Sequence, residues 1–187
     1  MIEKSCGLIL YRKRENKNEL EFFLSHPGGP HNKYKDYWLF PKGHIEEIDI
    51  DTESILLSDL KSWMKSEKNA AIREYIEETG DKTPIKLNIN PTYIGQVRQS
   101  KKKIVYVFAH VCTWDLKPED CFSNTIEVEY KGEIITIPEN DDYKWMTYNE
   151  LKDKTHEKHL PFYQKIIENP QLYTIENTFM CYKSLNC

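Results

Sequence analysis

The 187-residue chain has no apolar run long enough to cross a bilayer, and its mean hydropathy is −0.70. A transmembrane helix needs about 20 predominantly apolar residues, so we expect no membrane segment. The short apolar stretch at the N-terminus contains Glu3 and Lys4, which is not typical of a signal peptide. These absences favour a cytoplasmic protein.

Basic residues are not in excess, because 26 lysines and arginines face 30 acidic residues and leave a formal charge of −4. A surface for duplex nucleic acid usually carries a basic excess, so we expect no duplex partner. The five cysteines are odd in number and form no CxxC motif, which predicts reduced thiols. The sequence does not specify an oligomeric state.

Apolar stretches between polar turns predict a β-rich chain with several hairpins. Residues 12–18, 99–103 and 131–132 are polar turn segments between predicted strands. Residues 26–30 (HPGGP) are predicted to form a shaped loop. The predicted strands are residues 6–11, 20–24, 38–40, 92–97, 104–112, 126–130, 133–137 and 143–146.

Residues 70–79 are predicted to form a helix that ends at Gly80. Apolar residues between 56 and 64 recur at helical spacing. We expect a separate helix there, with a break near 65–67, because one helix over 54–79 would be about 39 Å long. Short helices are predicted at 149–154 and 162–168, and residues 171–187 form a C-terminal tail.

The helix carries a cluster of acids, since Glu74, Glu77 and Glu78 stand at i, i+3 and i+4 on one face. Carboxylates at this spacing repel one another, and a divalent cation reverses the sign of that interaction. Mg²⁺ and Mn²⁺ prefer oxygen ligands. Taken alone, the cluster is more typical of a solvated acidic helix face than of a metal site.

Two segments together resemble the Nudix hydrolase family: residues 38–46 (WLFPKGHIE) and, later, residues 73–80 (REYIEETG). The FPKGH form is similar to the asymmetric diadenosine tetraphosphate hydrolases, and the HPGGP loop is similar to that of a bacterial Nudix subgroup. The resemblance covers about residues 5–168. It implies an α/β class fold, an α/β/α sandwich with a mixed central sheet, in one domain over residues 1–170.

The spacing of the two segments departs from the family. Gly43 and Arg73 enclose 29 residues. This is about 16 more than separate the glycine and the arginine in the family's sequence motif, called the box, and it places an insertion at about 49–65. We expect it to add a helical segment. Either Asp49 or Glu67 takes the position of the first box glutamate, and the sequence leaves both open.

The resemblance implies a metal site and a catalytic set. Glu74, Glu77 and Glu78 would bind Mg²⁺, with Mn²⁺ as a substitute and the carbonyl of Gly43 as a further ligand. Arg73 would orient the glutamates. Glu139 is the candidate general base, and Glu74 is its rival.

Four further residues are candidates for substrate binding. Lys42 and His44 follow Pro41 and would meet phosphate, whereas a structured loop is the alternative. Arg98, with the lysines at 101–103, offers a cationic rim or a solvated hairpin tip. Tyr143 would stack on a purine or belong to the core.

We expect Mg²⁺-dependent hydrolysis of a nucleoside diphosphate linked to another group. The favoured substrate is a small nucleotide, a dinucleoside polyphosphate such as diadenosine tetraphosphate, cleaved to ATP and AMP. An alternative is a pyrophosphohydrolase for nucleoside triphosphates or RNA 5′ ends. A different class of function is a Nudix-like module that senses a nucleotide without turning it over.

Overall fold

The computed structural model describes residues 2–15, 17–30, 36–49 and 60–169. Its strands are β1 (Glu3–Lys13), β2 (Leu20–Pro27), β3 (Lys42–His44), β4 (Thr92–Ser100), β5 (Lys103–Val111), β6 (Thr125–Tyr130), β7 (Glu133–Pro138) and β8 (Asn140–Thr147). Its helices are α1 (Leu60–Thr79), α2 (Thr83–Lys86), α3 (Tyr148–Leu151) and α4 (Leu160–Glu168), with 3-10 turns at Glu47–Asp49, Pro118–Asp120 and Glu157–His159.

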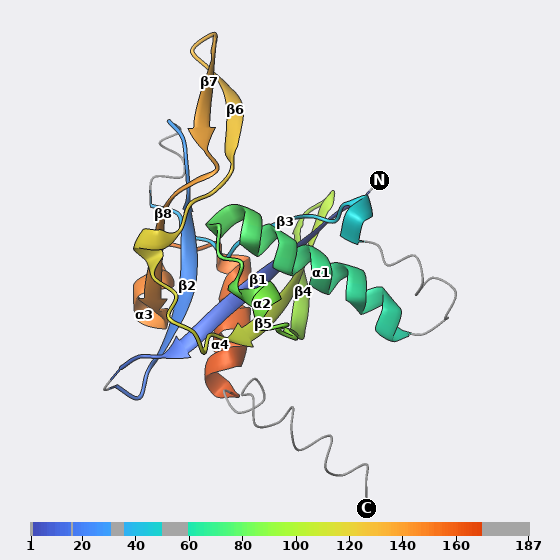
Figure 1. Cartoon of the computed structure of the whole chain (residues 1–187), viewed down its shortest axis with the longest axis vertical. Coiled ribbons are helices and arrows are strands. Elements are labelled where there is room, and N and C mark those ends of the chain that lie inside the picture. Colours follow the sequence, from blue (N-terminus) through green and yellow to red (C-terminus); the bar gives the residue numbers. More distant parts are fainter. Residues whose placement is uncertain (1, 16, 31–35, 50–59, 170–187) are drawn as a thin grey trace, which may run out of the picture.

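A six-stranded mixed sheet forms the centre, in the order β4-β5-β1-β2-β8, with β3 also paired to β1 (Figure 1). β1 runs parallel to β5, whereas the other pairings are antiparallel. Along its other edge, β1 pairs with β3 at residues 5–7 and with β2 at residues 11–13. β1 and β2 therefore pair only at one end, and β3 occupies the opposite end of that edge.

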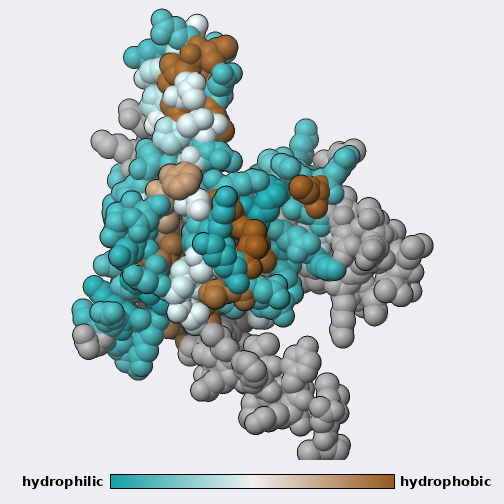
Figure 2. Space-filling view, in the orientation of Figure 1, coloured by the Kyte–Doolittle hydropathy of each residue, from teal (hydrophilic) through white to brown (hydrophobic). Residues whose placement is uncertain are grey.

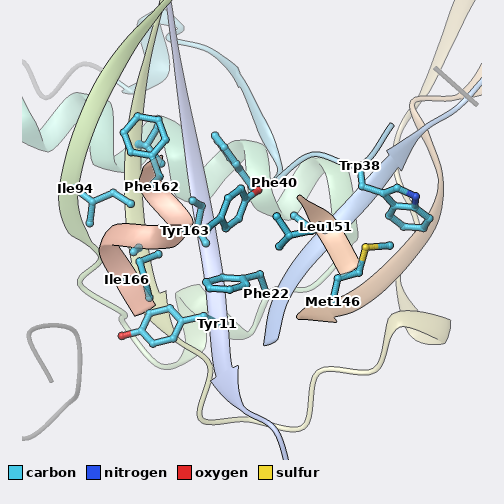
Figure 3. Packing of buried hydrophobic residues seen from close by; sticks show 14 of the residues in the cluster. Tyr11, Phe22, Trp38, Phe40, Ile94, Met146, Leu151, Phe162, Tyr163 and Ile166 are labelled. Atoms are coloured by element: carbon cyan, nitrogen blue, oxygen red, sulfur yellow. The ribbon is translucent and has the colours of Figure 1, made fainter. Parts of the chain in front are cut away.

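Each face of the sheet buries its own hydrophobic cluster, because successive side chains of a strand point to opposite faces. Cys6 and Leu8 of β1 pack in the cluster that includes Tyr75 of α1. Ile9 lies in the other cluster with Phe40 and Tyr163 of α4 (Figure 3). The expected α/β/α sandwich with a mixed central sheet is confirmed.

Helix α1 runs without interruption for 20 residues, about 30 Å. The predicted break near 65–67 is therefore wrong. The buried stripe of the helix continues through Glu67, Ala70, Ala71 and Glu74 at helical spacing, so packing against the sheet holds this stretch helical. Residues 50–59, which form most of the predicted insertion, lie outside the described residues.

Three other local predictions need correction. β2 extends through Pro27 and pairs with β8, so the predicted 26–30 loop begins only at Gly28. Residues 38–40 do not form a strand but one isolated bridge, between Leu39 and Ser25. The helix predicted at 149–154 is only α3, begun by a capping box at Thr147. The tail at 171–187 lies outside the described residues.

Strands β6 and β7 form a separate two-stranded sheet that projects from the sandwich (Figure 1). Lys131 and Gly132 both have positive φ, 54° and 85°, as a tight two-residue hairpin turn requires. The projecting hairpin carries apolar surface (Figure 2), and its Ile126 and Ile134 are 41% and 74% exposed. The hairpin predicted from the sequence is confirmed.

Cys6, Cys112 and Cys121 are free thiols. Within the described ranges, every helix is too short or too polar to cross a bilayer.

Candidate metal and phosphate site

The C-terminal half of α1 presents two buried carboxylates. Glu74 and Glu78 stand about one helical turn apart, and they are only 9% and 7% exposed. The backbone of β3 reaches Glu74 because Gly43 has no side chain: a Cβ at this position would overlap the Glu74 carboxyl group. Glycine therefore allows strand and carboxylate to approach closely.

Arg73 links the acids around this contact. Its Nε and Nη2 donate to the two carboxylate oxygens of Asp49, each at 3.0 Å, as a bidentate pair. Its Nη1 donates to Glu77 at 2.8 Å, and its Nη2 lies 3.0 Å from Glu74. Nη2 also donates to the carbonyl oxygen of His44 at 2.6 Å. These protein acceptors surround the guanidinium and suit it to orient the acids.

The contacts of Arg73 choose between the two acids that the sequence left open. Asp49 is 3% exposed and accepts both bonds of the bidentate pair. Glu67 is equally buried, but within the described part of the chain its Oε2 has no hydrogen-bond partner. Burial raises the pKa of Glu67. Asp49, and not Glu67, is therefore the acid that pairs with Arg73.

Three groups hold Glu78. The backbone N–H of Lys42 donates to Oε1 at 3.3 Å, and Nδ2 of Asn140 donates to Oε2 at 3.1 Å. The hydroxyl of Tyr143 donates to the Glu78 carbonyl oxygen at 2.6 Å. Strands β3 and β8 thus fix the end of α1 from two sides.

Both buried glutamates resist ionisation. Burial raises the pKa of Glu74 to about 7 against the attraction of Arg73. Burial raises the pKa of Glu78 to about 8 against the attraction of Lys42. Repulsion by Glu139, which follows β7 in the chain, adds to both shifts. Desolvated, crowded acids of this kind concentrate at functional sites.

These acids suit a hard divalent cation by chemistry, although the described residues contain no group of three His, Cys, Asp or Glu arranged to hold one. Glu77 pairs with Arg73. Carboxylate oxygens are the ligands that Mg²⁺ prefers, and the absence of a side chain at Gly43 brings the β3 backbone against the Glu74 carboxyl group. A cation would also offset the repulsion that Glu139 exerts on Glu74 and Glu78.

The two residues predicted to meet phosphate, Lys42 and His44, contact different partners. The backbone N–H of Lys42 donates to Glu78, whereas burial lowers the pKa of its side chain and the attraction of Glu78 and Glu139 opposes that effect. The side chain of His44 instead meets Glu3, with Nε2 2.7 Å from its carboxylate, and is 60% exposed. The structure thus brings the backbone of Lys42, but not the His44 ring, to the glutamates.

The other two predicted substrate contacts do not join this group. Arg98 donates to the carbonyl oxygen of Lys101 at the tip of the β4–β5 hairpin. Tyr143 is buried and stacks on Phe23 with ring centroids 6.1 Å apart. Because its ring and hydroxyl are both engaged inside the protein, Tyr143 occupies a core position with no face open to a purine.

Asn140 is the contact that the sequence did not reveal. It lies 62 residues from Glu78 and is almost completely buried. A lone asparagine before a strand is typical of a turn, so the residue pattern carried no signal for this role. Only its pairing opposite Pro27 at the start of β8 places the amide at the helix.

Comparisons with known proteins concern the family and the fold. A family model described as the NUDIX domain matches residues 5–166. The NUDIX domain of Shewanella oneidensis NrtR, complexed with ADP ribose, is 12% identical over 91% of this chain and 87% of its own, with a TM-score of 0.53. The C. elegans Ap4A hydrolase in a binary complex is 20% identical, over 88% and 95%, with a TM-score of 0.50.

A Nudix hydrolase from M. smegmatis, RenU, is 13% identical over 92% of this chain and 88% of its own, with a TM-score of 0.51. At these identities the likeness to solved structures concerns the fold. A comparison with curated proteins found no match. Since the family model covers well over half of the chain, the chain belongs to the NUDIX domain family.

Proposed function

We propose that this chain is a Mg²⁺-dependent pyrophosphohydrolase, for which Mn²⁺ can substitute, acting on a nucleoside diphosphate linked to another group. One observation carries the proposal. The Glu74 carboxyl group lies directly against the Cα of Gly43, with Glu78 one turn further along α1. This arrangement gathers hard oxygens beside the backbone of β3.

We assign different roles in metal binding and orientation to the residues of the site. The cation would be held by Glu74, Glu77, Glu78 and the carbonyl of Gly43. When bound, it supplies positive charge that stabilises the phosphate oxygens and lowers the pKa of a bound water. Arg73 keeps the acids in place through Asp49 and Glu77.

Proton transfer requires a carboxylate within reach of the attacking water. Glu139 repels Glu74 and Glu78 electrostatically and lies outside their helix, between β7 and β8. It is our candidate for the base that accepts the proton of water, and Glu74 is the rival.

The preferred substrate is a dinucleoside polyphosphate such as diadenosine tetraphosphate, cleaved to ATP and AMP. A chain of four phosphates carries several negative charges, and Lys42 adds a positive charge that attracts Glu78. Arg98 and the lysines at 101–103 belong to a separate hairpin, where they could meet the distal part of a long substrate. The fold shared with the C. elegans Ap4A hydrolase supports the same class.

Other substrates follow from the same site. Nucleoside triphosphates and RNA 5′ ends present the same phosphoanhydride, and ADP ribose is the ligand of the Shewanella oneidensis relative. The free thiols of the described region fit a cytoplasmic setting. A chain that binds nucleotides without hydrolysis would be a sensor.

A substrate panel with Mg²⁺ tests the proposal. The purified chain is incubated with diadenosine tetraphosphate, ATP, ADP ribose, sugar nucleotides and capped RNA, and products are separated by chromatography. ATP plus AMP from the first compound supports the preferred substrate. Turnover of another compound alone reassigns the substrate, and no turnover with either Mg²⁺ or Mn²⁺ rejects the enzyme in favour of the sensor.

A further inference from the structure

The backbone of Asn140, whose side-chain amide contacts Glu78, is itself fixed by hydrogen bonds. Its backbone N–H donates to Oγ of Ser123 at 2.8 Å, and the Ser123 hydroxyl lies 3.1 Å from the Asn140 carbonyl oxygen. Asn140 is 6% exposed and pairs opposite Pro27 at the start of β8. Backbone and surroundings therefore leave the side chain little freedom to leave Glu78.

The bond from Asn140 goes to a carboxylate oxygen of Glu78. Nδ2 donates to Oε2 at 3.1 Å, while Oε1 accepts from the Lys42 backbone at 3.3 Å. Each oxygen thus receives one neutral donor. Since a carboxylate oxygen can accept more than one bond, each keeps capacity for a cation.

The donor's charge matters as much as its position. A lysine or arginine at position 140 would neutralise Glu78 and compete with a metal ion, whereas an aspartate would repel it. An amide fixes a carboxylate without cancelling its charge. Partners of this kind, one shell outside a metal, orient the ligands and tune affinity.

Tyr143 provides a natural contrast on the same strand. Its hydroxyl donates to the backbone carbonyl of Glu78 rather than to the carboxylate. This bond anchors the end of α1 but does not orient the carboxylate. Of these two residues of β8, Tyr143 therefore contacts the helix backbone, whereas Asn140 contacts the Glu78 carboxylate.

We propose that Asn140 is a positioning residue that fixes the Glu78 carboxylate for a divalent cation while leaving its negative charge intact. The inference rests on the proposed function, because it requires Glu78 to be a metal ligand. It adds a determinant of metal affinity that lies outside the box helix, on a strand 62 residues away in sequence.

The test compares Asn140→Leu, which keeps the approximate shape and removes the donor, with Tyr143→Phe. Mn²⁺ binding to the full chain is measured by electron paramagnetic resonance, and activity is titrated with Mn²⁺ on the best substrate of the panel. We expect the Mn²⁺ dissociation and activation constants of Asn140→Leu to rise at least about 10-fold. Tyr143→Phe should lower the melting temperature and leave both constants unchanged.

Asn149→Leu, on the exposed surface of α3, is the matched asparagine control and should match the wild type. Asn140→Ala, a smaller side chain, should show the same shift and replaces Asn140→Leu if that variant does not fold. Unchanged Mn²⁺ constants in a folded Asn140 variant overturn this inference alone. A wild-type chain that neither binds Mn²⁺ nor hydrolyses any panel substrate overturns the proposed function as well.

Discussion

Adding one methyl group at Gly43 tests the contact on which the site depends. In Gly43→Ala, the new Cβ would overlap the carboxyl carbon and both oxygens of Glu74. The strand backbone is fixed by its pairing with Cys6, and a helix carries Glu74, so the carboxylate is the part that must yield. Reaching ordinary van der Waals distance requires a shift of more than about 1 Å.

A displacement of about 1 Å in a positioned group can lower a rate about 100-fold, or about 2.7 kcal/mol of transition-state stabilisation. We therefore expect Gly43→Ala to lose at least about 100-fold in kcat with Mg²⁺. The assay measures initial rates on the best panel substrate across a range of Mg²⁺ concentrations. Far-ultraviolet circular dichroism reports whether the fold survives.

Gly132→Ala is the matched control, because a Cβ at that hairpin turn meets no atom within 4 Å. Its φ of +85° costs stability when a side chain is added, but it should leave kcat unchanged. A folded Gly43→Ala protein with wild-type kcat and the same Mg²⁺ requirement would refute the reasoning. It would show that catalysis does not depend on the position of the Glu74 carboxylate against Gly43.

Three other predictions concern the acids of α1 and their partner. Glu77→Gln and Glu78→Gln should each lower turnover more than about 100-fold with an unchanged circular dichroism spectrum, and near-normal rates in both contradict the metal assignment. Asp49→Asn breaks the buried pair with Arg73 and should lower the free energy of unfolding in urea by about 3 kcal/mol; a loss below about 0.5 kcal/mol argues against that pair. Burial raises the pKa of Glu67 above 4.5, so in this pH range the folded wild type binds the Glu67 proton more tightly than the unfolded chain does. The folded state therefore loses stability as the pH rises from about 4.5 through the folded-state pKa. Glu67→Gln should flatten this dependence in urea titrations across pH, and an identical slope in both proteins refutes it.

The sequence was sufficient for features governed by local rules. Helical spacing puts Glu74 and Glu78 on one side of α1, and Gly80, with a φ of +70°, ends that helix where expected. The turn at Lys131 and Gly132 likewise defined its hairpin. In each case, the residues that decide the conformation lie within a few positions of one another.

Helix α1 shows where local reasoning failed. The expected break near 65–67 rested on the length of a single helix, but Glu67 continues the buried stripe of Ala70 and Ala71. Burial against the sheet stabilises helix beyond what intrinsic propensity specifies. Tyr143 is a related case, because an aromatic residue in a strand looks the same in sequence whether it faces a ligand or the core.

From its residues alone, the chain specified the helix that carries Glu74 and Glu78 and the family that a family model then matched. Only the tertiary structure chose Asp49 over Glu67 as the partner of Arg73 and brought Asn140 to Glu78. The reason is physical: periodicity and turn chemistry act over a few residues, whereas partners 24 or 62 positions apart meet only when the strands have paired and the helix has docked.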